Sequence, residues 1–133
     1  VQDENGSLYN TPPAFSIYMA DLVLRDLKEK GGVKAMNEIG TYKANLLYDF
    51  IDNSSFYKNN VEPRYRSIMN VPFVTGDADT DAKFVDEAKK NGLVSLKGHR
   101  LVGGMRASIY NAMPVEGVKA LIEFMKKFER ENA

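Results

Sequence analysis

The sequence predicts an α+β domain in two layers, in which a small mixed or antiparallel sheet packs against about four helices. Segments with helical periodicity alternate with short segments of strand-like alternation, in the order α-α-β-α-β-β-α, and this order favours helices packed on a sheet. The chain has 133 residues, of which 44% are hydrophobic. A chain of that length can form one hydrophobic core. We therefore expect a single domain over residues 1–133, with residues 1–10 as a mobile arm.

The first 51 residues should form two helices. Thr11 can cap the first helix, whose first turn holds Pro12 and Pro13, because the backbone donors of that turn are unpaired in any case. Gly31-Gly32 then ends the helix. A second apolar stripe over residues 33–51 predicts the next helix, although Gly40 interrupts it. The stripe of the first helix consists of Phe15, Tyr18, Met19, Leu22 and Val23.

Strands are expected at residues 67–74, 93–96 and 105–110, with a shorter one starting at residues 56–57 after a turn at 52–55. Pro72 cannot donate to a ladder, which places the first of these strands at an edge or at a strand end. In the segment 105–110, apolar residues alternate with polar ones. Arg106 therefore faces away from the apolar side of its strand.

Two further helices are expected in the second half of the chain. Asp79 or Thr80 should cap one that ends at Asn91-Gly92, and Pro114 should open the last one. The helix before Asn91 buries Phe84, Val85 and Ala88. The last helix has a regular apolar stripe, made of Val118, Leu121, Ile122, Met125 and Phe128. Its opposite, charged face is interpreted as a solvated surface.

Composition excludes several classes of function. Eighteen basic residues balance eighteen acidic ones, so no net field attracts nucleic acid or an anionic membrane. The absence of cysteine and the single histidine argue against disulfides, cysteine nucleophiles and a metal site made by the protein alone. No apolar run reaches the ~20 residues of a membrane span, and the polar N-terminus does not resemble a signal peptide. We expect a soluble, cytoplasmic protein.

Residues 97–106 are the most informative stretch for function. They place His99, Arg100 and Arg106 around the paired glycines Gly103-Gly104. An arginine fork matches carboxylate or phosphate oxygens two at a time, histidine adds a further donor, and glycines let the backbone turn tightly. The stretch predicts a site for a small dianion, a carboxylate or both. Solvated loop residues are the alternative interpretation.

Other motifs give weaker evidence for function. The acidic run at residues 77–81 resembles the start of a calcium loop, but Ala82 and Ala88 stand where a glycine and a bidentate glutamate are needed. The acids are better interpreted as helix caps. No glycine-rich nucleotide loop is present, and no nucleophile elbow supports a Ser-His-Asp triad around His99.

Four stretches together resemble the phosphoserine aminotransferase family, which are pyridoxal-phosphate enzymes of serine biosynthesis. The longest is Ser95 to Arg100 followed by Gly103 to Ala112. Residues 7–15, with Asn10-Thr11-Pro12-Pro13, residues 63–74 and residues 118–129 also agree. The resemblance covers nearly the whole chain and implies the C-terminal small domain of a fold-type I aminotransferase.

The resemblance also implies roles for particular residues. Asn10 and Thr11 match residues that bind the cofactor phosphate of the neighbouring subunit in a homodimer. His99 and Arg100 match the residues that hold the substrate phosphate, and Arg106 matches the arginine that holds the α-carboxylate. Without the resemblance, Thr11 is interpreted as an N-cap and Asn10 as a turn residue.

The rest of such an active site is missing from this stretch. A pyridoxal-phosphate aminotransferase needs a Schiff-base lysine, a carboxylate at the pyridine nitrogen and an aromatic face under the ring, which the family takes from its large domain. We therefore expect no catalytic residue here, no cofactor bound by this chain alone and no activity in isolation. The first hypothesis is a domain that supplies anion-binding residues to the large domain of the enzyme. The second is an excised or engineered scaffold with no catalytic function.

Overall fold

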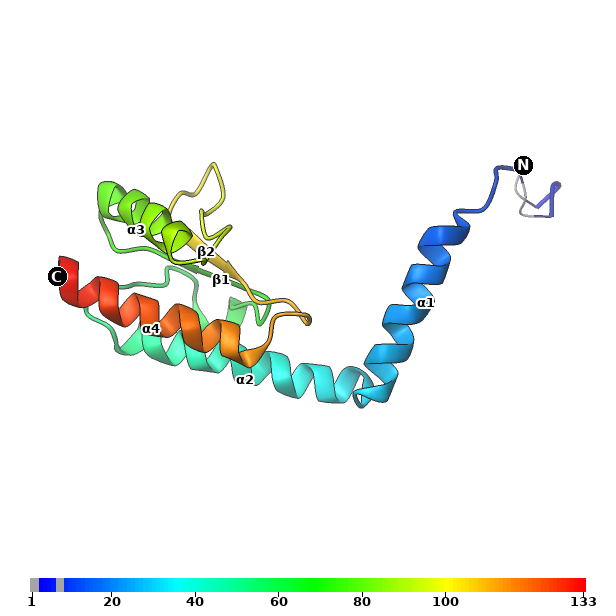
Figure 1. The fold of residues 1–133 in the computed structure, drawn as a ribbon, viewed down its shortest axis with the longest axis horizontal. Coiled ribbons are helices and arrows are strands. Elements are labelled where there is room, and N and C mark those ends of the chain that lie inside the picture. The colour runs from blue at the N-terminus through cyan, green and yellow to red at the C-terminus, as the bar shows by residue number, and fades with distance from the viewer. Residues whose placement is uncertain (1–2, 7–8) are drawn as a thin grey trace. The chain divides into compact units, whose positions relative to one another are not determined.

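The computed structural model describes residues 3–6 and 9–133. The chain forms helices, one short 3-10 helix and a two-stranded sheet, which confirms the predicted α+β class (Figure 1). In chain order they are α1 (Ala14–Glu29), α2 (Gly32–Asn53), η1 (Pro63–Tyr65), β1 (Asn70–Phe73), α3 (Ala78–Lys90), β2 (Met105–Ser108) and α4 (Val115–Asn132). Within the described residues, no helix has the combined length and apolar character that crossing a bilayer requires.

The chain divides into two compact units, Val1–Met36 and Asn37–Ala133. The first contains α1, and the second contains α3, α4, both strands and most of α2. The predicted mobile arm over residues 1–10 falls partly outside the described residues, at Val1, Gln2, Ser7 and Leu8. It stays a prediction.

Helix α1 starts later than predicted. Its N-cap is Pro13, which makes no side-chain cap hydrogen bond, so the expectation that Thr11 caps this helix is wrong. The physical reason is that Thr11 and Pro12 each precede a proline, whose ring disfavours the helical conformation of the residue before it. Neither Thr11 nor Pro12 therefore enters the helix, which begins at Ala14.

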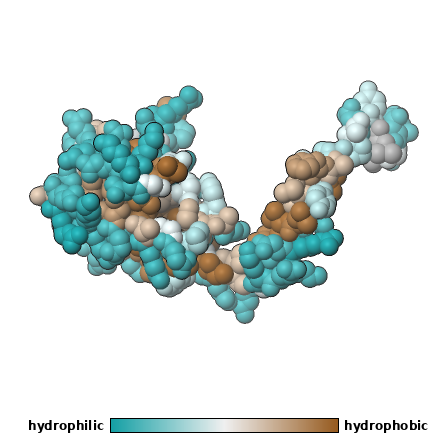
Figure 2. Space-filling model, in the orientation of Figure 1, coloured by the Kyte–Doolittle hydropathy of each residue, from teal (hydrophilic) through white to brown (hydrophobic). Residues whose placement is uncertain are grey.

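The apolar stripe of α1 has the predicted spacing, but it is left exposed in its own unit. No residue of α1 is buried, and Phe15 is 76% exposed. Figure 2 shows apolar surface gathered along this helix. The other large exposed apolar residues of α1 are Ile17, Tyr18, Met19, Leu22, Val23 and Leu24.

Helix α2 runs without a break through Gly40, despite the low helix propensity of glycine. The glycine is buried, and a Cβ there would lie 3.4 Å from Ile68 Cδ1. Close packing of the segment that leads into β1 therefore compensates for the weak propensity. The buried face of α2 contains Lys43, Ala44, Leu47, Tyr48 and Ile51 in addition to the glycine.

The core of the unit Asn37–Ala133 is built on one face of the two-stranded sheet. Strands β1 and β2 are antiparallel, and Val71, Phe73, Met105 and Ala107 alternate onto the buried face. Phe84 of α3 is fully buried among other aromatic rings, with centroid distances of 5.0 to 5.9 Å. The apolar stripe predicted for α4 is buried as expected.

The strands are shorter than the alternation predicted. The Ser67 hydroxyl accepts hydrogen bonds from the backbone N–H groups of Met69 and Asn70, at 3.0 and 3.1 Å, so a local turn occupies the start of the predicted segment. The predicted strand at residues 93–96 is wrong, because Ser95 has φ 63°, outside the extended region. The segment starting at residue 56 contributes only an isolated bridge, between Lys58 and Val74.

The cap of α3 lies two residues before Asp79 and three before Thr80, the two predicted caps. Asp77 is the N-cap, and its carboxylate accepts a hydrogen bond of 2.8 Å from the backbone N–H of Thr80. Bonds from the hydroxyl and the N–H of Thr80 lower the pKa of Asp77. Asp79 lies in the first turn, where its charge favours the helix N-terminus.

Candidate functional site

The loop between Leu96 and β2 is closed by its own backbone. The N–H of Gly98 donates to the carbonyl of Gly104 at 2.8 Å, and the N–H groups of Val102 and Gly103 both donate to the carbonyl of His99, at 2.9 and 2.8 Å. Gly103 and Gly104 have φ angles of 76° and 65°, which other residues rarely adopt. The paired glycines therefore form the tight turn that the sequence predicted.

This loop presents two donor side chains. His99 and Arg100 are both exposed. The backbone N–H of Leu101 donates to Nδ1 of His99 at 3.2 Å, which leaves Nε2 as the nitrogen that can face a ligand. Arg100 makes no hydrogen bond or ion pair with another described residue, so its fork is free to bind an anion.

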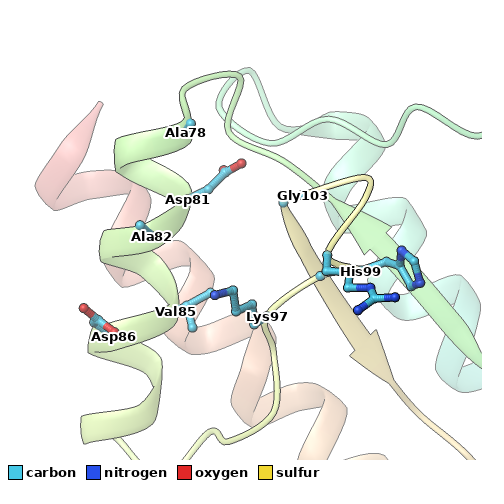
Figure 3. A pocket seen from close by; sticks show the side chains of 11 residues that line it. Ala78, Asp81, Ala82, Val85, Asp86, Lys97, His99 and Gly103 are labelled. Atoms are coloured by element: carbon cyan, nitrogen blue, oxygen red, sulfur yellow. The ribbon is translucent and has the colours of Figure 1, made fainter.

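A pocket of about 330 Å³ lies between this loop and α3. Its α3 side carries the carboxylates of Asp81 and Asp86. Lys97 extends toward α3, whereas the ring of His99 lies on the side of the loop away from α3 (Figure 3). Because carboxylates repel a phosphate, the face of the loop away from α3 suits an anion better than this pocket does.

Asp81 is already committed to a structural role at the start of α3. Its Oδ1 accepts hydrogen bonds of 2.8 Å from both the backbone N–H and the hydroxyl of Thr75. The carboxylate thereby ties the end of β1 to α3. One of its two oxygens is thus engaged within the protein.

Arg106 lies on β2, directly opposite Pro72 of β1. It occupies the face of the two-stranded sheet away from the core, as predicted, and its backbone N–H donates to the carbonyl of Leu96 at 2.8 Å. Its Nε is buried and has no hydrogen-bond partner among the described residues. A buried donor without an acceptor in the protein is rare, and a ligand, an ion or a water can satisfy it.

The structure brings two of the three predicted substrate residues together. His99 and Arg100 are neighbours on one turn and border the same pocket. Arg106 follows on the strand that leaves the loop and does not line that pocket. Convergence of all three on one ligand stays a prediction.

The two predicted cofactor residues lie in the first unit. Asn10 and Thr11 are exposed in the segment before α1. Neither side chain makes a hydrogen bond to another described residue. Their donors are therefore available to a ligand, and their role in binding the cofactor phosphate stays a prediction.

Lys43 of α2 supports the candidate site, and the sequence analysis did not identify it. It is 1% exposed, and its Nζ donates to the carbonyls of Ile109, Tyr110 and Met113 at 3.1, 2.8 and 2.8 Å. Burial lowers the pKa of this ammonium. The three bonds fix the chain as it leaves β2, the strand that carries Arg106.

Residues 1–121 match the family model of the class-V aminotransferases. The chain belongs to this family. Two curated proteins named phosphoserine aminotransferase are among its relatives. That of Bacillus cereus is 57% identical over 129 residues, which are 97% of this chain and 36% of that protein. That of Histophilus somni is 57% identical over 132 residues, which are 99% of this chain and 37% of that protein.

Solved structures of phosphoserine aminotransferases also match. A phosphoserine aminotransferase from Bacillus circulans subsp. alkalophilus superposes with a TM-score of 0.94 at 45% identity, over 99% of this chain and 37% of that one. A pyridoxal-phosphate-bound phosphoserine aminotransferase from Trichomonas vaginalis gives 0.86 at 44% identity, over 94% and 36%. The resemblance found in the sequence is confirmed. This chain spans a little over a third of the length of these relatives.

Proposed function

We propose that this chain is the C-terminal domain of a phosphoserine aminotransferase-like enzyme. The reaction of the whole enzyme is amino transfer between phosphoserine and 2-oxoglutarate, giving 3-phosphohydroxypyruvate and glutamate, or the reverse in serine biosynthesis. His99 and Arg100 bind the substrate phosphate, and Arg106 binds the α-carboxylate. The observation that carries this proposal is Arg106, whose buried Nε has no acceptor among the described residues.

Pyridoxal phosphate is the cofactor that this proposal implies. When bound, it would carry the amino group between the two substrates. Within this chain, Asn10 and Thr11 fit one part of it, because their exposed and unpaired donors can hold its phosphate. Lys43 does not fit the covalent role, since its ammonium is engaged by three carbonyls. The chain therefore contributes to cofactor binding without anchoring the cofactor by itself.

The proposal also includes partners. The large domain of the same enzyme and a second subunit are the surfaces against which α1 would pack, because its apolar stripe is uncovered in the unit Val1–Met36. A substrate site built from exposed donors gains strength when a second wall excludes water. Such an enzyme would act in the cytoplasm.

The alternative is a stand-alone scaffold with no catalytic function. One observation favours it: the unit Asn37–Ala133 closes its own hydrophobic core. A closed core does not require a partner for folding. This alternative predicts a cooperative melt and no aminotransferase activity in any larger assembly.

A chimera decides between the two functions. The part of the Bacillus cereus relative that precedes the matched segment is joined to this chain, and phosphoserine-dependent glutamate formation is measured in the presence of pyridoxal phosphate. The proposal is supported if the chimera shows turnover and the same chimera with Arg106→Leu shows turnover at least about 100-fold lower. A chimera that binds cofactor but shows no turnover supports the scaffold.

A further inference from the structure

The face of the two-stranded sheet opposite the core carries polar residues beside Arg106. The register pairs Asn70 with Ser108 and Pro72 with Arg106. Alternation places these four residues on the same face, since their neighbours in both strands are buried. Asn70 is therefore the diagonal neighbour of Arg106, a position from which two long side chains can reach a common ligand.

Hydrogen bonds fix the orientation of the Asn70 carboxamide. Its Oδ1 accepts from the hydroxyl of Ser108 and from the hydroxyl of Tyr110, both at 3.2 Å. With the oxygen engaged by two hydroxyls, the N–H groups of Nδ2 remain for a ligand. Its two N–H donors have no acceptor among residues 3–6 and 9–133.

The chemistry of this face selects a carboxylate. Arg106 and Asn70 are both donors without acceptors, while Pro72, Ser108 and Tyr110 bring no negative charge. A carboxylate offers about four lone pairs, of which a guanidinium fork takes two. An amide N–H can take a third.

We propose that Asn70 is a second carboxylate-binding residue, which completes the grip of Arg106 on the α-carboxylate of the amino acid. Ser108 and Tyr110 are positioning residues that hold the carboxamide in the donating orientation. This inference rests on the proposed function for the identity of the ligand. It adds a determinant for the carboxylate, separate from the loop that binds the phosphate.

The test is an NMR titration of the 133-residue chain labelled with ¹⁵N. Phosphoserine is compared with phosphoethanolamine, which has the phosphate and the amine but no carboxylate. The readouts are the Asn70 side-chain amide and the Arg106 Nε–H, whose burial slows its exchange with water. Both signals should shift with phosphoserine with one dissociation constant, and neither should shift with phosphoethanolamine.

The decisive variant is Asn70→Asp. It keeps an acceptor for both hydroxyls and replaces only the donating NH₂, so the fold should survive. We expect phosphoserine binding to weaken at least about fivefold, with phosphoethanolamine binding changed less than about twofold. Asn60→Asp, at an exposed loop residue, gives the same change of charge and should alter neither ligand.

Three results would overturn the inference. The Asn70 amide could fail to respond to phosphoserine in the unmodified chain, the variant could bind phosphoserine as well as the unmodified chain does, or it could lose both ligands equally. Failure of the proposed function is recognised separately, by the absence of turnover in the chimera. If the chimera shows turnover but the Asn70 amide signal does not respond to phosphoserine, only the role of Asn70 is rejected.

Discussion

Replacing Lys43 by methionine should destabilise the unit Asn37–Ala133. Methionine keeps the apolar stem of the side chain but removes the ammonium that serves three carbonyls, those of Ile109, Tyr110 and Met113. One of these hydrogen bonds is buried and two are partly buried. The carbonyl of Tyr110 keeps a second donor, the backbone N–H of Met113 at 2.9 Å. The main effect of the substitution is therefore the loss of the donor at the carbonyls of Ile109 and Met113.

The magnitude follows from this geometry. A buried carbonyl left without its donor costs about 1–3 kcal/mol, and a half-buried one costs less because water reaches it. The total cost is about 3 kcal/mol. Removal of the ammonium returns about 1 kcal/mol of desolvation, in line with the burial that lowers the pKa of Lys43. We expect the free energy of unfolding to fall by about 2 kcal/mol.

Urea unfolding followed by circular dichroism near neutral pH measures this change. Lys119→Met is the matched control, because Lys119 is an exposed lysine of α4 without an ion pair to another described residue. The control should stay within about 0.5 kcal/mol of the unmodified chain. A Lys43→Met chain as stable as the control would refute the reasoning and show that a methionine core suits this position equally well.

Three further predictions concern stability. Asp52 forms a double hydrogen bond with Arg66, at 2.5 and 2.8 Å, that lowers the pKa of the carboxyl below 3.8. The ion pair should therefore contribute about 0.5 kcal/mol of stability above pH 3.8, and this contribution should disappear as the pH falls through the pKa of Asp52 in the folded chain. Thermal melts from about pH 7 to about pH 2 test this, because the Tm values of Asp52→Asn and of the unmodified chain should converge at the acid end. Phe84→Ala should cost about 3–5 kcal/mol in urea unfolding, because the ring is fully buried, and a cost below about 1 kcal/mol would contradict the packing. Gly104→Ala should lower Tm more than Gly92→Ala: both have positive φ, but only at Gly104 would a Cβ meet an atom 2.6 Å away. Equal Tm values would show that the crowding is relieved.

Helical periodicity predicted the positions of the helices better than it predicted their surroundings. Leu47 and Phe128 are buried where their stripes predicted contact. The stripe of α1 is equally regular, yet Phe15 and Val23 are exposed. Periodicity reports which face of a helix is apolar, and it does not say whether a partner covers that face within the same chain.

Strand ends and caps were predicted less well because side chains decide them locally. The hydroxyl of Ser67 shortens β1, and the positive φ of Ser95 prevents a strand beside it. Alternation of apolar residues does not report either feature. The choice of Asp77 over Asp79 as a cap likewise depends on one hydrogen bond to Thr80.

The candidate site could be predicted only where it is local in sequence. His99, Arg100 and the glycines lie within six residues, so the turn that joins them is visible in the sequence. Lys43 and Asn70 act on groups 66 and 38 residues away. No local pattern reports such partners, and only the packing of α2 and the register between β1 and β2 bring them together.

The most direct test of the central claim separates the two anions of the substrate. In the chimera, kcat/KM is measured for phosphoserine and for serine, in the unmodified form and in an Arg100→Met variant. If the loop binds the phosphate, the variant should lose at least about tenfold in its preference for phosphoserine, equivalent to about 1.4 kcal/mol, while its activity toward serine changes little. An unchanged preference would contradict the assignment of this loop to the phosphate.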